Sequence, residues 1–248
     1  MRDPITITRE AELNAPTRIE SSVLLGRVLV ACEYSGTVRD AFAARGWDAW
    51  SCDLLPSETP GNHLTGDVTE IINQEWDIII AHPPCTYLTV TANKWLKDQP
   101  PRKSGTLVGQ ARRDAREEAV AFFMLFANCK CPHVAIENPI GCMSTRYRKP
   151  EQIVQPWQYG HEETKATCLW LKNLPKLVPT KIVEPVFWTA GGKKYSPTHY
   201  NSKASLRSRN RLDYLPPGKD RSKFRSKTYD GIAAAMANQW TRALCSNS

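Results

Sequence analysis

The sequence lacks the features of several large protein classes. Apolar runs such as 28–32 and 78–81 are far shorter than the roughly 20 residues that a membrane-spanning helix needs. The first residues contain no apolar signal-peptide core, and eight cysteines among 248 residues are too few for a disulfide scaffold. Cys129 and Cys131 with His133 lack the second pair of ligands that a zinc finger needs. We therefore expect a cytoplasmic protein with reduced thiols, no metal and no membrane contact.

Acidic residues are scarce in one long segment. Residues 181–227 contain twelve Lys or Arg and three acids, a net charge of +9, whereas the whole chain carries +8. A basic segment beside a nearly neutral body predicts a polyanionic partner, most simply nucleic acid. A solvated basic loop is the simpler alternative. The expected phosphate contacts are Arg207, Arg209, Arg211, Arg221, Lys223 and Arg225.

Buried strands and helices alternate along most of the chain. Strands are expected at 27–32, 47–52, 76–81, 133–136 and 167–171, and helices at 38–45, 69–74, 109–129 and 231–244. This alternation predicts an α/β fold with a mostly parallel sheet. The expected parts are an N-terminal arm at 1–25, a core at 26–177, a small irregular basic insert at 178–224 that recognises DNA, and a C-terminal helix at 225–248 that completes the core.

Polar and glycine residues follow the expected strands, where parallel sheets bind their ligands. The first strand leads into a turn, 33–36, whose glycine lets backbone N–H groups approach a ligand. Asp53 follows the second strand and is suited to ribose hydroxyls, although it could instead cap a turn. The G-x-G-x-x-G fingerprint of dinucleotide sites is absent. The sequence therefore favours a cofactor that contains a nucleoside without a dinucleotide pyrophosphate.

Two further strand ends carry reactive side chains. Pro83 and Pro84 stiffen the exit of the third strand and so present Cys85 from a rigid frame, as a nucleophile requires. A buried structural cysteine is the alternative. Glu137, at the end of the next strand, is suited to act as an acid or as a hydrogen-bond partner of a heterocycle, unless it is merely a polar rim residue.

In order and spacing these motifs resemble the DNA cytosine-5 methyltransferase family, in its short bacteriophage or prophage type. The resemblance covers about 27–172, with a weaker echo at 227–239, and its specific part is the Pro-Pro-Cys motif with the Glu-Asn pair. It implies a Rossmann-like fold that uses S-adenosylmethionine and modifies phage DNA in the bacterial cytoplasm, which would protect that DNA from restriction.

The resemblance also implies a role for each matching residue. Cys85 would add to C6 of a cytosine flipped out of duplex DNA, and Glu137 would hold N3 and N4 of that base. The residues implied to bind the cofactor are Cys32, Glu33, Tyr34, Ser35, Gly36, Asp53, Leu54, Asp67, Val68, Pro83 and Gly231.

The sequence departs from the family at two places. Glu33 occupies a position where the family commonly has a glycine. The family's Gln-x-Arg-x-Arg segment, which contacts the base, cannot be recognised in this sequence; the most similar stretch is 155–161, followed by Lys165. Three alternatives therefore stay open. One is an amino-group methyltransferase acting on adenine N6 or cytosine N4, whose motif has a polar residue at the place of His82. The others are an RNA- or nucleotide-level enzyme and a non-catalytic DNA-binding protein on a degenerate methyltransferase scaffold.

Overall fold

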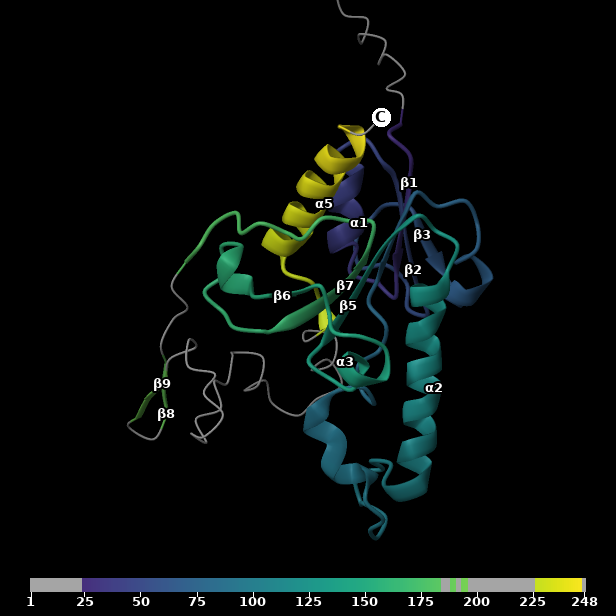
Figure 1. The fold of residues 1–248 in the computed structure, drawn as a ribbon, viewed down its shortest axis with the longest axis vertical. Helices are drawn as coiled ribbons and strands as arrows, with labels where there is room; N and C mark the ends of the chain where they lie inside the picture. Colours follow the sequence, from purple (N-terminus) through teal and green to yellow (C-terminus); the bar gives the residue numbers. More distant parts are fainter. Residues whose placement is uncertain (1–23, 184–187, 191–192, 196–225, 247–248) are drawn as a thin grey trace, which may run out of the picture.

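A seven-stranded sheet forms the centre of the protein (Figure 1). The computed structural model describes residues 24–183, 188–190, 193–195 and 226–246. The strand order is β3-β2-β1-β4-β5-β7-β6, in which β7 pairs antiparallel with both β5 and β6. The strands are β1 (Arg27–Ala31), β2 (Asp48–Asp53), β3 (His63–Thr65), β4 (Ile78–Ala81), β5 (His133–Pro139), β6 (Gln152–Val154) and β7 (Thr167–Lys172). This arrangement confirms the predicted α/β fold with a mostly parallel, Rossmann-like sheet.

Helices and short 3-10 segments connect and cover the strands. The helices are α1 (Thr37–Ala43), α2 (Gly109–Asn128), α3 (Met143–Arg146) and α5 (Asp230–Cys245), and the 3-10 segments are η1 (Val68–Glu70), η2 (Val90–Leu96) and η3 (Pro156–Gln158). A separate two-stranded sheet consists of β8 (Trp188–Ala190) and β9 (Lys193–Tyr195). Within the described ranges, no helix is both long and apolar enough to cross a bilayer.

The central strands are buried on both faces because helices pack on each side. Val28 and Val30 of β1 point into a cluster with α1 and α5, whereas Leu29 and Ala31 point into a second cluster with α2. Successive side chains of a strand face opposite sides, so an uninterrupted apolar run is what such a doubly covered strand requires. Burial of this kind contributes about 25 cal/mol per Å² of apolar surface.

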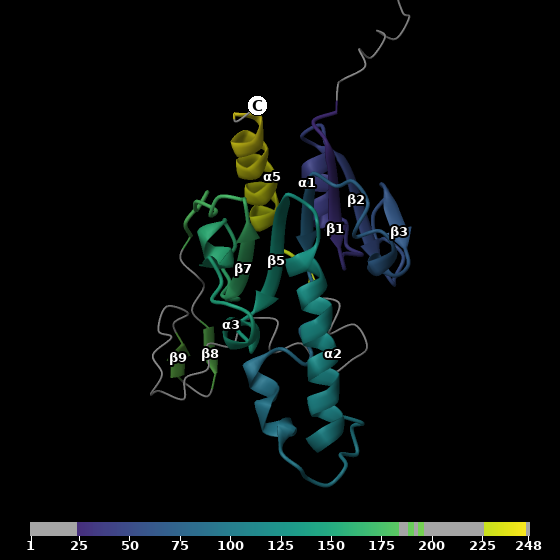
Figure 2. The same cartoon turned by 45° about the vertical axis from the view of Figure 1, so that its right-hand side comes forward.

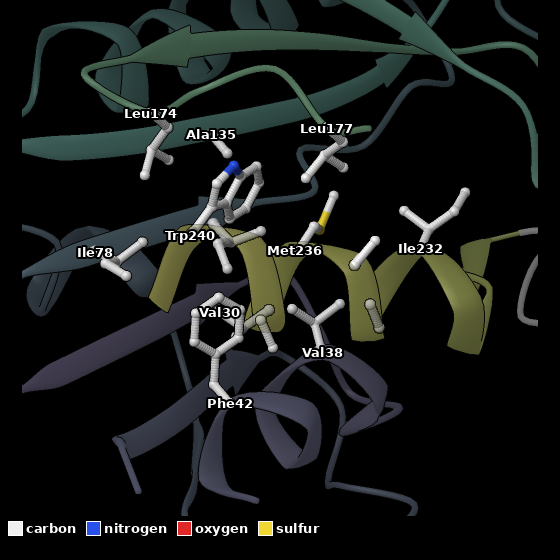
Figure 3. Packing of buried hydrophobic residues seen from close by; sticks show 14 of the residues in the cluster. Val30, Val38, Phe42, Ile78, Ala135, Leu174, Leu177, Ile232, Met236 and Trp240 are labelled. Carbon is white, nitrogen blue, oxygen red and sulfur yellow. The ribbon is translucent and has the colours of Figure 1, made fainter. Parts of the chain in front are cut away.

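The C-terminal helix α5 lies beside α1, against the face of the sheet that contains Val28 and Val30 (Figure 3). Trp240 is fully buried, and its indole N–H donates to the carbonyl of Pro175 at 2.9 Å. The indole of Trp47 donates to Thr241 at 2.8 Å and so links α5 to the start of β2. Residues labelled in the figure around the helix are Val30, Val38, Phe42, Ile78, Ala135, Leu174 and Leu177. These contacts join the last helix to the first βαβ unit.

Helix α2 covers the opposite face of the sheet and extends beyond it. Phe123 and Phe126, in its C-terminal half, are fully buried in the second cluster. Its N-terminal half projects beyond the carboxyl ends of the strands, next to the segment that contains η2 (Figure 2). The segment that follows Cys85 is thus supported by α2.

The structure corrects several element boundaries. Strand β5 continues through Glu137 to Pro139 because β7 pairs with these residues beyond the last residue of β4. The helix expected at 69–74 is only the 3-10 segment η1. The expected arm and most of the basic insert lie outside the described residues, apart from 24–25, 178–183 and the β8–β9 pair.

Candidate active site

The carboxyl ends of β1, β2 and β4 meet at one rim. Beyond the strands, the N–H of His82 donates to the carbonyl of Ala31 at 2.9 Å. The N–H of Glu33 donates to the carbonyl of Cys52 at 3.2 Å. These two bonds hold the β1–α1 turn and the His82–Cys85 turn side by side, so the strand ends expected to share a site are brought together.

Glu33 is buried and caps helix α1. Its Oε1 accepts the N–H of Val38 at 2.7 Å and the hydroxyl of Ser35 at 3.2 Å, and its Oε2 accepts the N–H of Arg39 at 3.2 Å. A carboxylate at this place satisfies N–H groups that the helix leaves unpaired and complements the helix dipole. The Glu33 carboxylate is therefore committed to α1, which leaves the backbone of the turn to contact a ligand.

The turn itself has an unusual backbone. Cys32 has φ 58° and Gly36 has φ 75°, both in the left-handed region. A Cβ on Gly36 would lie 2.2 Å from Oγ1 of Thr59, so glycine is required there. The strained conformation of Cys32 costs about 1–3 kcal/mol, and strain of this kind concentrates at ligand-binding sites.

Asp53 and Asp67 lie near the same rim. Oδ1 of Asp53 accepts the N–H of Leu55 at 2.9 Å, so the expected alternative of a turn cap is present. Oδ1 of Asp67 accepts the N–H of Thr69, and this bond lowers the pKa of Asp67. Burial, assisted by the charges of Asp53 and Asp67, raises the pKa of Cys52 to about 11. The two carboxylates thus create a negative field at the ends of β1 and β2, beside exposed Leu54 and buried Val68.

A small pocket joins the first turn to the C-terminal segment. Its lining consists of Cys32, Glu33, Tyr34, Ser35, His82, Ser226, Lys227 and Thr228. The hydroxyl groups of Tyr34 and Ser226 lie 3.3 Å apart, and Lys227 forms an ion pair with Glu58. The sequence analysis missed Ser226, and the weak family similarity at 227–239 was the only signal for Thr228.

Gly231 lies outside this pocket. Its N–H donates to Nε2 of His161 at 3.0 Å, and a Cβ would lie 1.9 Å from the carbonyl of Tyr159. The absence of a side chain is therefore required by packing at the start of α5. A role of Gly231 in binding the cofactor therefore stays a prediction, three residues after Thr228 of the pocket lining.

Cys85 is exposed at the rim, whereas Pro83 is buried. The side-chain amide of Asn138 donates to the carbonyl of Pro83 at 2.7 Å, which ties β5 to the Pro-Pro turn. The carbonyl of Cys85 accepts the N–H groups of Leu88 and Thr89 in a tight turn. Hydrogen bonds therefore fix the backbone that carries this exposed thiol, and Cys85 is not a buried structural cysteine.

Two buried arginines of α2 hold the segment after Cys85. Arg112 donates to the carbonyl of Thr86 at 3.1 Å, and Arg116 donates to the carbonyl of Tyr87 at 2.8 Å. Arg116 also donates to Oδ1 of Asn93 in η2 at 2.8 Å. The sequence analysis missed this role, although two arginines four residues apart on the buried side of an amphipathic helix were a usable signal.

Glu137 sits among several groups that stabilise its charge. Burial alone would raise its pKa, but the hydrogen bond with His82, the charge of Lys165 and a hydrogen bond with Thr167 offset this and hold the pKa of Glu137 below its ordinary value. The distance from Nδ1 of His82 to Oε2 of Glu137 is 3.4 Å. Glu137 is therefore a carboxylate in the unliganded protein, and Lys165 is a cation of the site that the sequence left without a role.

The cysteines considered for zinc lie away from this rim. The thiol of Cys131 donates to the carbonyl of Trp76 at 3.2 Å, and Nδ1 of His133 lies 3.0 Å from the carbonyl of Asp77, both near the beginning of β4. Among the described residues, no group of three or more His, Cys, Asp or Glu side chains is arranged to hold a metal ion.

Comparisons with known proteins add one structural likeness. No protein-family model and no curated protein matches the chain. It is similar to a solved structure designated as a DNA modification methyltransferase encoded within a prophage of E. coli, with 16% sequence identity and a TM-score of 0.40. The match covers 64% of this chain and 52% of that one, so this chain accounts for about half of its length.

The six basic residues expected to contact phosphates, Arg207, Arg209, Arg211, Arg221, Lys223 and Arg225, lie outside the described part of the chain.

Proposed function

We propose that the protein is a methyltransferase that uses S-adenosylmethionine to modify C5 of cytosine in DNA. The observation that carries this proposal is the pairing of two neighbouring strand ends. Exposed Cys85 comes two residues after the buried Pro83, whose carbonyl accepts a hydrogen bond from Asn138, and Asn138 is the next residue after Glu137. A nucleophile and a carboxylate are thereby held on rigid, adjacent elements, as covalent catalysis on a ring requires.

The chemistry explains why both residue types are needed. C5 of cytosine is a poor nucleophile until a thiolate adds to C6, which moves the ring electrons toward N3 and makes C5 enamine-like. Protonation at N3 by Glu137 offsets the charge that would otherwise build up on the ring. C5 then takes the methyl group, the C5 proton leaves, and elimination restores the ring and the Cys85 thiolate.

The residues at the rim fit a cofactor that contains a nucleoside. The second carboxylate oxygen of Asp53 can accept ribose hydroxyls, and Asp67 with Val68 lies where the adenine would be held. The backbone of 32–35 and Ser226–Thr228 would surround the amino-acid end, because these residues line one pocket. When bound, the cofactor would supply an electrophilic methyl group, and Pro83 would be one of the residues that hold it.

DNA is the proposed substrate because the basic segment suits phosphate contacts. Arg207, Arg209 and Arg211, together with Arg221, Lys223 and Arg225, would supply these contacts. The target cytosine must leave the base stack to reach Cys85, since the thiol has to approach C6 from a face of the ring. Protection of phage DNA from restriction is the biological role that this activity would serve.

A second candidate is methylation of an amino group, on adenine N6 or cytosine N4. It is favoured by the place of His82, which precedes Pro83 and Pro84 where those enzymes have a polar residue that accepts from the amino group, and which lines the pocket. The exposed Cys85 has no role in this candidate, whereas C5 chemistry uses it together with Glu137.

The deciding experiment is incubation of the protein with labelled S-adenosylmethionine and duplex DNA, followed by digestion and mass spectrometry of the nucleosides. 5-Methylcytosine is the expected product. N4-methylcytosine or N6-methyladenine would establish the second candidate instead. Transfer to RNA or to free cytidine nucleotides at an equal rate would replace DNA as the substrate, and DNA binding without any transfer would indicate a non-catalytic protein.

A further inference from the structure

His82 is a buried titratable residue at the site to which C5 chemistry assigns no step. Its side chain is 8% exposed, and its Nδ1 faces Oε2 of Glu137 at 3.4 Å. Because an ionised carboxylate only accepts hydrogen bonds, Nδ1 must carry the hydrogen. Nε2 is buried as well and has no hydrogen-bond partner among the described residues, on a side chain that lines the pocket. Buried polar atoms without a partner are rare in folded proteins and call for an explanation.

Of the groups near His82, Glu137 is the one that can exchange a proton with it. The titratable and charged groups near the pair are Cys32, Glu33, Tyr34, Lys165, Lys227 and Cys168, whose pKa burial and the charge of Glu137 raise to about 11. Glu33 accepts three hydrogen bonds at the start of α1, and burial raises the pKa of the Cys32 thiol, so that Cys32 stays neutral. Lys227 pairs with Glu58, and Lys165 contributes a fixed positive charge beside Glu137.

We propose that His82 and Glu137 form a proton-sharing pair, in which His82 supplies the proton that Glu137 delivers to the cytosine ring. This inference rests on the proposed C5 methyl transfer. When the Cys85 sulfur forms its bond to C6, the ring electron pair moves to N3, which takes a proton from Glu137. Glu137 takes the Nδ1 proton of His82, and the imidazolium becomes a neutral imidazole. Water then takes the C5 proton, the C5–H electron pair forms the C5–C6 double bond, and the S–C6 bond breaks to release the Cys85 thiolate. The proton on N3 returns through Glu137 to His82.

A proton-sharing pair explains how Glu137 can donate a proton although it is ionised before the reaction. The lowered pKa of Glu137 means that this carboxyl holds little proton near neutral pH, although its step at N3 requires one. Histidine is the side chain that gains and loses a proton most readily in this range. A histidine in contact with the carboxylate lets Glu137 stay ionised between turnovers and still act as an acid during one.

Substitution of His82 by asparagine separates proton supply from positioning. An asparagine amide nitrogen takes roughly the place of Nδ1 and can donate to Glu137, but it cannot give up its proton. We expect His82→Asn to keep the thermal midpoint and the S-adenosylmethionine affinity, to slow covalent capture of 5-fluorocytosine DNA by about 100-fold, and to lose the fall in kcat at high pH. His133→Asn is the matched control, because His133 also places Nδ1 toward an acceptor, the carbonyl of Asp77, but near the opposite end of β4.

Wild-type rates and an unchanged pH profile in His82→Asn would show that His82 only positions Glu137 and would overturn the proposal. A slowed variant with an unchanged pH profile would overturn it as well.

NMR of the His82 ring tests the pair without any turnover. Glu137→Gln should move the Nδ1 resonance of His82, because this ring nitrogen loses its charged hydrogen-bond acceptor. An unchanged resonance would overturn the pair. A changed resonance in a protein that transfers no methyl group would leave the pair intact and remove the proposed function, so the two failures are distinguishable.

Discussion

The side-chain amide of Asn138 donates a 2.7 Å hydrogen bond to the main-chain carbonyl of Pro83. Asn138 is only 2% exposed and Pro83 is buried, so water cannot replace this bond if the amide is removed. The bond connects β5, which carries Glu137, to the turn that carries Cys85. It therefore sets the relative placement of the two side chains that the proposed chemistry uses.

Asn138→Ala should destabilise the protein by about 1–3 kcal/mol, because it leaves the buried carbonyl of Pro83 without a partner. It should also lower kcat more than it weakens cofactor binding. Asn173→Gly is the matched control: Asn173 makes a similar amide contact to the carbonyl of Pro132, but at the surface, and glycine tolerates its φ of 53°. Chemical denaturation and steady-state kinetics measure both effects, and equal losses in the two variants would contradict the account.

Arg116→Gln should release the segment after Cys85. Hydrogen bonds from charged groups contribute about 1.5–3 kcal/mol, so kcat should fall about 10- to 100-fold while the affinity for S-adenosylmethionine stays near wild type. Hydrogen exchange of residues 87–93 should become faster. Arg113→Gln, on the same helix but bonded to Leu96 and Asp98 farther along the segment, should change kcat by less than about threefold. Unchanged exchange in Arg116→Gln would rule out the holding role.

Asp53→Ala tests the cofactor rim. Loss of hydrogen bonds to a charged acceptor should weaken S-adenosylmethionine binding by about 10- to 150-fold. Asp48→Ala is the control, since Asp48 lies at the other end of β2 and pairs with Arg27. Calorimetry reports both affinities, and an unaltered affinity in Asp53→Ala would remove this residue from the site.

Stability should depend on pH through Glu137. Its pKa in the folded protein lies below the ordinary value of 4.5, so the carboxylate contributes stability that is fully present above about pH 4.5. This contribution is lost as the pH falls through the lower, folded-state pKa. The free energy of unfolding of the wild type should therefore decrease more steeply below pH 4.5 than that of Glu137→Gln. The exposed Glu118→Gln should follow the wild-type curve; identical slopes for all three proteins would contradict the assigned direction.

The long central elements were predictable because both of their faces are buried. The runs around β1 and β4 are apolar throughout, and α2 was placed nearly to the residue. The edge strands β3 and β6 were missed because three residues with exposed positions such as Leu64 and Ile153 carry no periodic signal. Their strand structure depends on pairing with neighbours distant in the sequence.

The site likewise combines features that a local sequence pattern predicts with contacts between residues distant in the sequence. The strand ends around Cys85 and Glu137 could be found from the sequence, since each follows an apolar run. The contacts of Asn138 with Pro83 and of His82 with Glu137 could not, because each joins residues 55 positions apart that meet only where β4 and β5 end side by side. The position of Lys165 beside Glu137 likewise depends on the antiparallel return of the chain through β7.

Covalent trapping at Cys85 tests the central claim most directly. Duplex DNA containing 5-fluorocytosine, incubated with the protein and S-adenosylmethionine, should form a complex that survives denaturing electrophoresis, because the C5 fluorine cannot leave as a proton would. Peptide mass spectrometry should place the adduct on Cys85. Cys85→Ala should form no adduct and transfer no methyl group, whereas Cys245→Ala, which removes an exposed thiol on α5, should behave as wild type. Methyl transfer by Cys85→Ala at the wild-type rate, or an adduct on another residue, would contradict the account.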